Sequence, residues 1–172
     1  MVFSYLKEKG LDVVGIGKIG DIYARIGLTE SCHTADNAED MAMLMKQLAV
    51  HRDGEGLIMA NFVDFDSMYG HRRDPQGYAR CLEDFDRMLG GLLEELQADE
   101  LLMITADHGN DPTAKGSDHT REEVPLLVYS PGLHESIDLG TRSTYADLGQ
   151  TIMDNFDAGR LAFGRSFLPE LR

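Results

Sequence analysis

Tryptophan is absent and cysteine is scarce in this chain: Cys32 and Cys81 lie far apart and outside any Cys-x-x-Cys pattern. Two such cysteines support neither a disulfide framework nor a thiolate zinc site, and they fit a reducing compartment. No apolar run approaches the roughly 20 residues of a membrane-spanning helix, and the N-terminus has neither a basic start nor a long apolar segment. We therefore expect a cytoplasmic protein that neither spans a membrane nor is secreted.

Basic residues are also in short supply, with 16 lysines and arginines against 30 aspartates and glutamates, which gives a formal charge of -14 at pH 7. This charge disfavours nucleic acid or an anionic membrane as the main partner. The 172 residues, 42% of them hydrophobic, are enough for one core, and no repeat, low-complexity tract or linker divides them. We expect a single domain over residues 1–172.

The apolar runs are short and are separated by segments of helical period, which favours an α/β fold with a mostly parallel sheet and helices on both faces. Four strands are predicted, at Asp12–Ile16, Leu57–Phe62, Leu101–Ala106 and Leu126–Ser130. Because these runs are almost continuously apolar, all four are expected to be central strands covered on both faces.

Helices are predicted at about Phe3 to Lys9, Ala38–Val50, Tyr78–Leu96 and Tyr145–Phe156, the last with Thr144 as N-cap. Gly90-Gly91 predicts a kink or break in the third, since each glycine costs up to about 1 kcal/mol against alanine in a helix. The short first helix leads straight into a strand, which predicts a sheet edge without a partner and, through that edge, self-association.

Acidic and imidazole side chains follow two of the predicted strands. Asp64, Asp66 and His71 come after Leu57–Phe62, Asp107 and His108 come after Leu101–Ala106, and His119 stands eleven residues past His108. Ligands of open α/β sheets bind beyond the carboxyl ends of the strands, and carboxylate and imidazole bind divalent ions such as zinc and manganese. A metal centre is favoured over the alternative that these residues only form turns, because three motifs occur together.

Other polar residues carry weaker signals. Arg72 and Arg73 fit either a phosphate site or a solvated ion-pair network with the nearby acidic residues, and both interpretations remain open. The run Gly15–Gly20 resembles a phosphate-binding glycine loop but has the spacing of neither GxxxxGK[ST] nor GxGxxG. The remaining histidines are assigned surface or structural roles: His33, His51 and His134.

Five stretches together resemble a known family. They are GIGKIGDIYA (15–24), NFVDFDSMYGHRRDPQGYAR (61–80), ITADHGNDPT (104–113), SDHTREEVPLLVYSPG (117–132) and DLGTRSTYADLGQTI (138–152). Nearly end to end, the chain resembles the C-terminal part of the catalytic core of bacterial phosphopentomutases, metalloenzymes of the alkaline phosphatase superfamily. The ADHG and DHTRE pieces are also similar to cofactor-independent phosphoglycerate mutases, whereas GHRRDP and GKIGDIYA point to phosphopentomutases.

The resemblance implies two divalent ions, expected to be Mn²⁺, with Asp66, His71 and His119 as ligands of one and Asp107 and His108 as ligands of the other. Asp64 competes with Asp66, but the step from carboxylate to histidine matches the family when it starts at Asp66. Lys18 is expected to bind substrate by facing the transferred phosphoryl group.

The resembled enzymes are isomerases of nucleoside catabolism that interconvert ribose or 2-deoxyribose 1-phosphate and 5-phosphate through a phosphothreonine and a bisphosphate. Their N-terminal strand with a further aspartate ligand, their threonine nucleophile and their cap domain have no counterpart here. Thr105, Thr113 and Thr120 lie near the expected ligands but outside the family's nucleophile context. We therefore expect an incomplete alkaline-phosphatase-like core that takes a pentose phosphate substrate in the intact family and is inactive alone.

Two alternatives remain. One is a phosphoglycerate mutase or phosphatase of the same superfamily. The other is a noncatalytic metal-binding or interaction module that pairs its open sheet edge with another chain.

Overall fold

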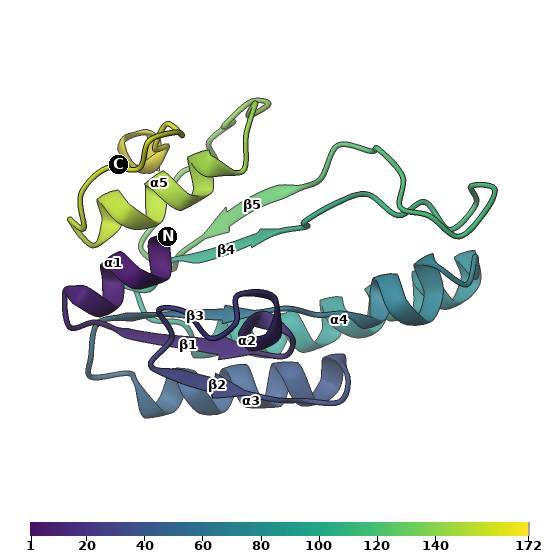
Figure 1. Ribbon diagram of the computed structural model, residues 1–172, viewed down its shortest axis with the longest axis horizontal. Coiled ribbons are helices and arrows are strands. Elements are labelled where there is room, and N and C mark those ends of the chain that lie inside the picture. Colours follow the sequence, from purple (N-terminus) through teal and green to yellow (C-terminus); the bar gives the residue numbers. More distant parts are fainter. Residues whose placement is uncertain (172) are drawn as a thin grey trace.

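A computed structural model describes residues 1–171 and contains a parallel sheet of three strands with the order β2-β1-β3 (Figure 1). The strands are β1 (Asp12–Ile16), β2 (Glu30–Cys32) and β3 (Gly56–Ala60). The predicted strands at β1 and β3 are confirmed, and they pair in parallel with Gly15 opposite Met59. Sequence reasoning missed β2, because this short strand has exposed polar residues at its first two positions and no hydrophobic run.

Helices cover both sides of this sheet, which confirms the α/β fold class. In Figure 1, α1 (Val2–Glu8) and α5 (Ala146–Asn155) lie together above it, and α3 (Asn37–Val50) lies below it and packs on α4 (Pro75–Glu95). A buried apolar cluster joins α1 and α5 to the sheet: Phe3, Leu6, Val13, Ile19, Leu28 and Ile152. None of the helices described is long and apolar enough to span a bilayer.

The helix starts follow from local capping. The Asp36 carboxylate accepts a hydrogen bond from the Glu39 N–H (2.9 Å) at the start of α3, and Asp74 does the same for Gly77 (2.9 Å) at the start of α4. For α5 the predicted cap, Thr144, is off by one: the N-cap is Tyr145, and Thr144 Oγ1 accepts a hydrogen bond from the Ala146 N–H (3.2 Å).

The break predicted at Gly90-Gly91 is absent, since α4 continues through both glycines to Glu95. Both glycines face open space, and Leu92 next to them is buried. Burial of the apolar face therefore stabilises the helix against the local cost of the glycines.

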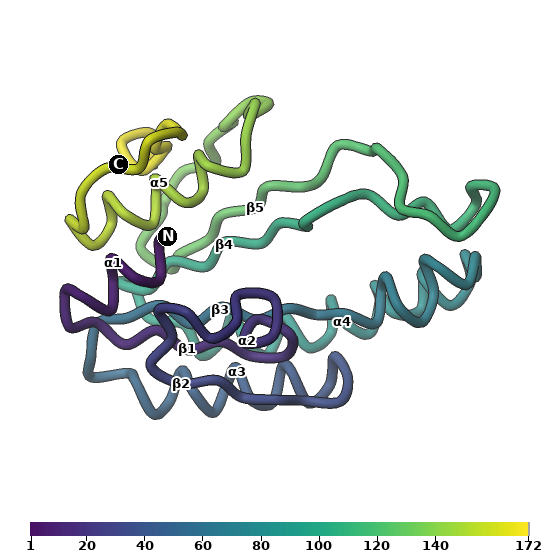
Figure 2. The backbone as a smooth tube through the Cα atoms, in the orientation of Figure 1, coloured from purple at the N-terminus to yellow at the C-terminus, as the bar shows by residue number. Residues whose placement is uncertain are grey.

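The second half of the chain departs from the predicted parallel arrangement. Strands β4 (Leu102–Thr105) and β5 (Leu126–Tyr129) form a separate antiparallel pair with Leu102 opposite Tyr129. Parallel pairing needs a crossover, usually a helix, whereas residues 106–125 contain none and fold back as a long hairpin (Figure 2). The prediction of parallel strands is therefore wrong for β5.

The prediction that all four strands are covered on both faces is also wrong for β5, because Leu127 is 58% exposed and Tyr129 41% exposed. Both side chains line an apolar groove together with leucine and isoleucine side chains of α4 and β4. The strand that follows the first helix, β1, is not a free edge, because it pairs with β2 on one side and β3 on the other. Within residues 1–171 the strands with one unpaired edge include β3, which pairs only with β1, and β4, which pairs only with β5. Self-association through such an edge stays a prediction.

The glycine run at the end of β1 is explained by packing. Gly17 has φ +70°, and a Cβ there would lie 2.7 Å from the Asn61 carbonyl oxygen and 2.9 Å from the Asp40 carboxylate. A Cβ at Gly20 would overlap the Ser31 hydroxyl. The following helix α2 (Ile19–Ile22) has only four residues. The run therefore allows the chain after β1 to approach its neighbours closely.

Candidate metal centre

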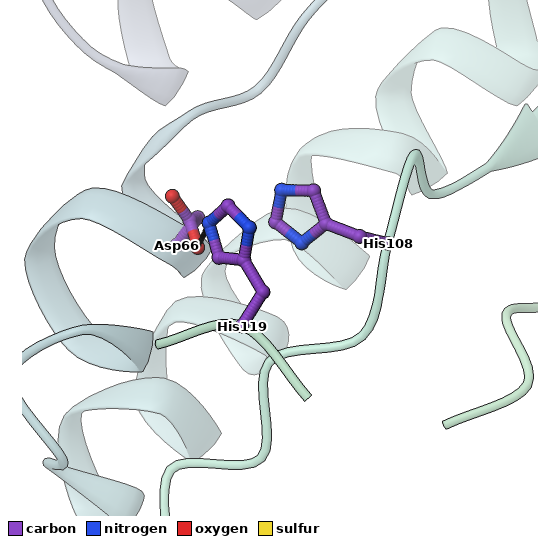
Figure 3. A group of neighbouring side chains, drawn as sticks. All are labelled: Asp66, His108 and His119. Carbon is purple, nitrogen blue, oxygen red and sulfur yellow. Dashed lines mark ion pairs between the residues drawn. The ribbon is translucent and has the colours of Figure 1, made fainter. Parts of the chain in front are cut away.

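The polar clusters at the carboxyl ends of β3 and β4 meet, as the sequence predicts. After β3 the chain turns into one wide π-helical segment, η1 (Phe65–Gly70), which carries Asp66. His108 follows β4, and His119 lies on the returning arm of the hairpin. Figure 3 shows Asp66, His108 and His119 converging; each offers one ligand atom, and these atoms lie within 4.8 Å of one another.

His71 lies at the same place. Its Nε2 is 3.2 Å from Asp66 Oδ2 and 3.1 Å from His119 Nε2, and His119 Nε2 is 3.4 Å from Asp66 Oδ1. The His108 ring stacks on that of His119 with centroids 3.6 Å apart. One carboxylate and three imidazoles thus lie together where the loops after β3 and β4 meet.

Hydrogen bonds to backbone carbonyls orient two of these imidazoles. His71 Nδ1 lies 2.5 Å from the Ser117 carbonyl oxygen, and His108 Nδ1 lies 3.2 Å from that of Gly109. Because a carbonyl only accepts, Nδ1 is the donor in each contact, and in the neutral form of each ring Nε2 then has a free lone pair. His71 Nε2 lies 3.1 Å from His119 Nε2 and 3.2 Å from an Asp66 carboxylate oxygen. Electron-rich atoms this close together repel one another unless a shared proton or a cation lies between them.

Asp64 is engaged elsewhere. Its carboxylate accepts a hydrogen bond from the Asn37 N–H (3.0 Å), and its own N–H donates to Asn37 Oδ1 (3.1 Å). Asn37 is the first residue of α3 and is buried. The structure therefore brings Asp66, and not Asp64, to the imidazoles, and Asp64 ties the loop to α3.

Two of the expected site residues, Asp107 and Lys18, are not part of the group formed by Asp66, His108 and His119. The Asp107 side chain is 71% exposed, with Oδ1 3.6 Å from His108 Nε2. Lys18 is exposed directly after β1, at the carboxyl edge that β1 shares with β3. His108 groups with Asp66 and His119, where the resemblance pairs it with Asp107. In residues 1–171 no second group of three such ligands is present, so the second ion stays a prediction.

Sequence reasoning missed the residues that support the cluster. Asn110 Nδ2 donates to Asp66 Oδ1 (2.5 Å), Thr120 N–H donates to the Gly109 carbonyl (3.0 Å), and Thr120 Oγ1 accepts from the Asp111 N–H (2.6 Å). The motif Asp107–Asp111 signals a turn, but no local pattern reveals partners 44 residues away.

Cys81 is buried and does not belong to the group of converging ligands. Burial, followed by the nearby Asp64 charge, raises the pKa of its thiol to about 11. At neutral pH, and with no ion bound, the group is therefore a neutral thiol. His51, one of the histidines assigned structural roles, is also not part of the cluster. Its Nδ1 lies 3.0 Å from the Asp12 carboxylate.

Comparison with known proteins identifies the class. A sequence model of the Metalloenzyme superfamily matches residues 10–159, and the chain belongs to this superfamily. The PH0037 protein from Pyrococcus horikoshii has a similar fold, with a TM-score of 0.64 and 20% identity over 92% of this chain and 45% of that one. This chain thus spans less than half the length of that structure.

The residues present fit the metal that the superfamily implies. A carboxylate oxygen and imidazole nitrogens with free lone pairs form a donor set typical of zinc, manganese and related divalent ions. Membership of the superfamily and this triad together support divalent metal binding at the carboxyl ends of β3 and β4.

Proposed function

We propose that the chain forms the metal-binding part of a phosphopentomutase-like enzyme, which interconverts pentose 1-phosphates and 5-phosphates. The observation that supports this proposal most is the convergence of Asp66, His108 and His119 at the carboxyl ends of two strands. The GHRRDP and GKIGDIYA stretches favour a pentose phosphate over phosphoglycerate as substrate.

In this proposal the side chains have distinct roles. Asp66, held by Asn110, supplies the negative charge, and His71 and His108 present Nε2 lone pairs because their Nδ1 protons point at carbonyls. Divalent ions held by these side chains would supply positive charge that offsets the charge on the phosphoryl and attacking oxygens. Lys18, exposed at the same edge of the sheet, binds the phosphoryl group.

Within residues 1–171, the three threonines near the cluster lie on β4 or in the hairpin and not at the start of a helix, and each hydroxyl contacts a neighbouring oxygen. Thr113 Oγ1 donates to the Asp111 carboxylate (2.7 Å), and Thr120 Oγ1 donates to Glu122 (2.5 Å). Thr105 Oγ1 contacts the Ala106 carbonyl at 3.4 Å. The chain alone is therefore expected to bind the phosphate ester without converting it.

This proposal is tested by calorimetric titration of the Mn²⁺-loaded chain with ribose 5-phosphate, 3-phosphoglycerate and inorganic phosphate. We expect ribose 5-phosphate to bind tightest. Lys18→Ala is expected to weaken its binding about tenfold or more, since a hydrogen bond to a charged group contributes about 1.5–3 kcal/mol. Lys46→Ala is the matched control, because Lys46 is an exposed lysine on α3.

Three results would contradict parts of this proposal. Tighter binding of 3-phosphoglycerate would favour the phosphoglycerate mutase alternative. Equal affinities of the Lys18→Ala and Lys46→Ala variants would remove Lys18 from the site. Formation of ribose 1-phosphate by the pure chain, followed by ³¹P NMR, would show that a nucleophile is present within it.

A further inference from the structure

Arg73 occupies an unusual position behind the metal-binding cluster. It is half-buried, has φ +54°, and follows η1 by three residues. Its guanidinium donates only to neutral oxygens, on three segments of the chain: the carbonyls of Gly70, Asp111, Gly116 and Asp118, and Oδ1 of Asn110. Neither of the interpretations open from the sequence, a phosphate site or an ion-pair network, matches these contacts.

Each of the three segments carries one member of the cluster. Asp66 belongs to η1, which ends at Gly70. His108 lies just before Asn110 and Asp111, and His119 directly follows Asp118. A single guanidinium thus bonds to all three ligand-bearing segments at once.

Arg73 also acts on Asp66 through one intermediate. Its Nη1 lies 2.6 Å from Asn110 Oδ1, and Asn110 Nδ2 donates to Asp66 Oδ1 at 2.5 Å. The acceptor side of the amide faces the guanidinium, so the donor side must face the carboxylate. Gly70 makes room for this contact, because a Cβ there would overlap the Asn110 amide.

Only arginine suits this arrangement. Its fork presents five N–H groups in fixed directions, whereas the lysine ammonium presents three donors from one point. The contacts engage Nε, both hydrogens of Nη1 and one of Nη2, which leaves too few donors for bidentate binding of a phosphate.

We propose that Arg73 is a positioning residue that assembles the three ligand-bearing segments before a metal ion binds, and so sets the metal affinity without touching the ion. This inference rests on the proposed metal centre. The groups behind metal ligands typically change metal affinity 10–100-fold when they are replaced.

The test compares Arg73→Ala and Arg73→Lys with Arg72→Ala in the full chain. Arg72 is the matched control because it is adjacent and exposed, and no hydrogen bond of its side chain is seen within residues 1–171. Alanine and lysine keep a Cβ, so the backbone strain at φ +54° is unchanged. Mn²⁺ affinity is measured by calorimetry, and hydrogen exchange of the Asp111 and Thr120 amides is measured without metal.

We expect both Arg73 variants to bind Mn²⁺ about 10–100-fold more weakly and to exchange these two amides faster, with Arg72→Ala close to wild type. Denaturant unfolding identifies a variant that has lost the whole fold. If Arg73→Ala does not fold, the test rests on Arg73→Lys, which keeps the positive charge and the aliphatic part of the side chain. Wild-type affinity and exchange in Arg73→Lys would overturn the inference. If the folded wild type binds no Mn²⁺, the metal centre fails, and the exchange rates alone then decide whether Arg73 assembles the segments.

Discussion

Replacing Asp66 with alanine is expected to weaken Mn²⁺ binding by more than about 100-fold, exceeding the 10–100-fold loss typical for residues behind the ligands. Asp66 is the one carboxylate of the triad with His108 and His119, so the variant loses both a ligand and the negative charge that attracts the ion. Calorimetric titration of the purified chain with Mn²⁺ measures the effect, and circular dichroism confirms that the variant is folded.

Two controls separate a ligand from an ordinary acidic or imidazole group. Asp84 is exposed on α4 and pairs with Arg87 (2.9 Å), so Asp84→Ala is expected to keep wild-type affinity. His119→Ala is expected to resemble the Asp66 variant, and His33→Ala to resemble the wild type, since His33 is exposed and is not one of the converging ligands. Unchanged affinity in both Asp66→Ala and His119→Ala would favour the interpretation that these residues only form turns.

The second large effect is on stability. Gly17→Ala is expected to lower the free energy of unfolding by about 2–5 kcal/mol, because it combines a left-handed backbone conformation with overpacking. The added Cβ would meet the Asn61 carbonyl oxygen at 2.7 Å and the buried Asp40 carboxylate at 2.9 Å. Denaturant unfolding followed by circular dichroism measures the loss.

Gly10 provides the matched control for this prediction. It also has a positive φ, of +86°, but nothing lies within 4 Å of its added Cβ. Gly10→Ala should therefore show only the backbone cost of about 1–2 kcal/mol. Equal losses in the two variants would mean that close packing at Gly17 contributes nothing, and the explanation of the glycine run by packing would be wrong.

Much of what positions the candidate site is predictable from the sequence. The apolar runs at β1 and β3 and the helical stripes of α3 and α4 are local signals, and the structure has strands and helices at these places. The stripes themselves are only partly buried, since Met41 and Leu92 are buried but Leu82 is 50% exposed. The placement of Asp66 and His108 at strand ends also follows from local order along the chain. To predict that the two clusters converge, one needs in addition only the rule that ligands of α/β sheets bind beyond the carboxyl ends of the strands.

The remaining features depend on contacts between distant residues. The direction of β5 is set by the helix-free hairpin before it, tied by the pairing of Gly109 with Thr120. The grouping of His108 with Asp66 depends on how that hairpin folds over η1. The role of Arg73 was invisible, because its acceptors are backbone carbonyls, which every residue carries.

The exposed face of β5 shows the same limit. Its burial alternates, with Leu127 and Tyr129 exposed on the face that lines the groove beside α4, which is the pattern of a strand with one covered face. The sequence of β5 is apolar at every position, so composition predicts a fully covered strand. Apolar composition therefore does not distinguish a central strand from one whose outer face is open.

The central claim is that the loops after β3 and β4 form a divalent metal site. Crystals of the chain soaked in Mn²⁺, with anomalous diffraction data, test it most directly. We expect an anomalous peak at ligand distance, about 2 Å, from Asp66 Oδ and from Nε2 of at least two of the histidines at 71, 108 and 119. A folded chain with no peak there, or with its only peak elsewhere, would contradict the claim.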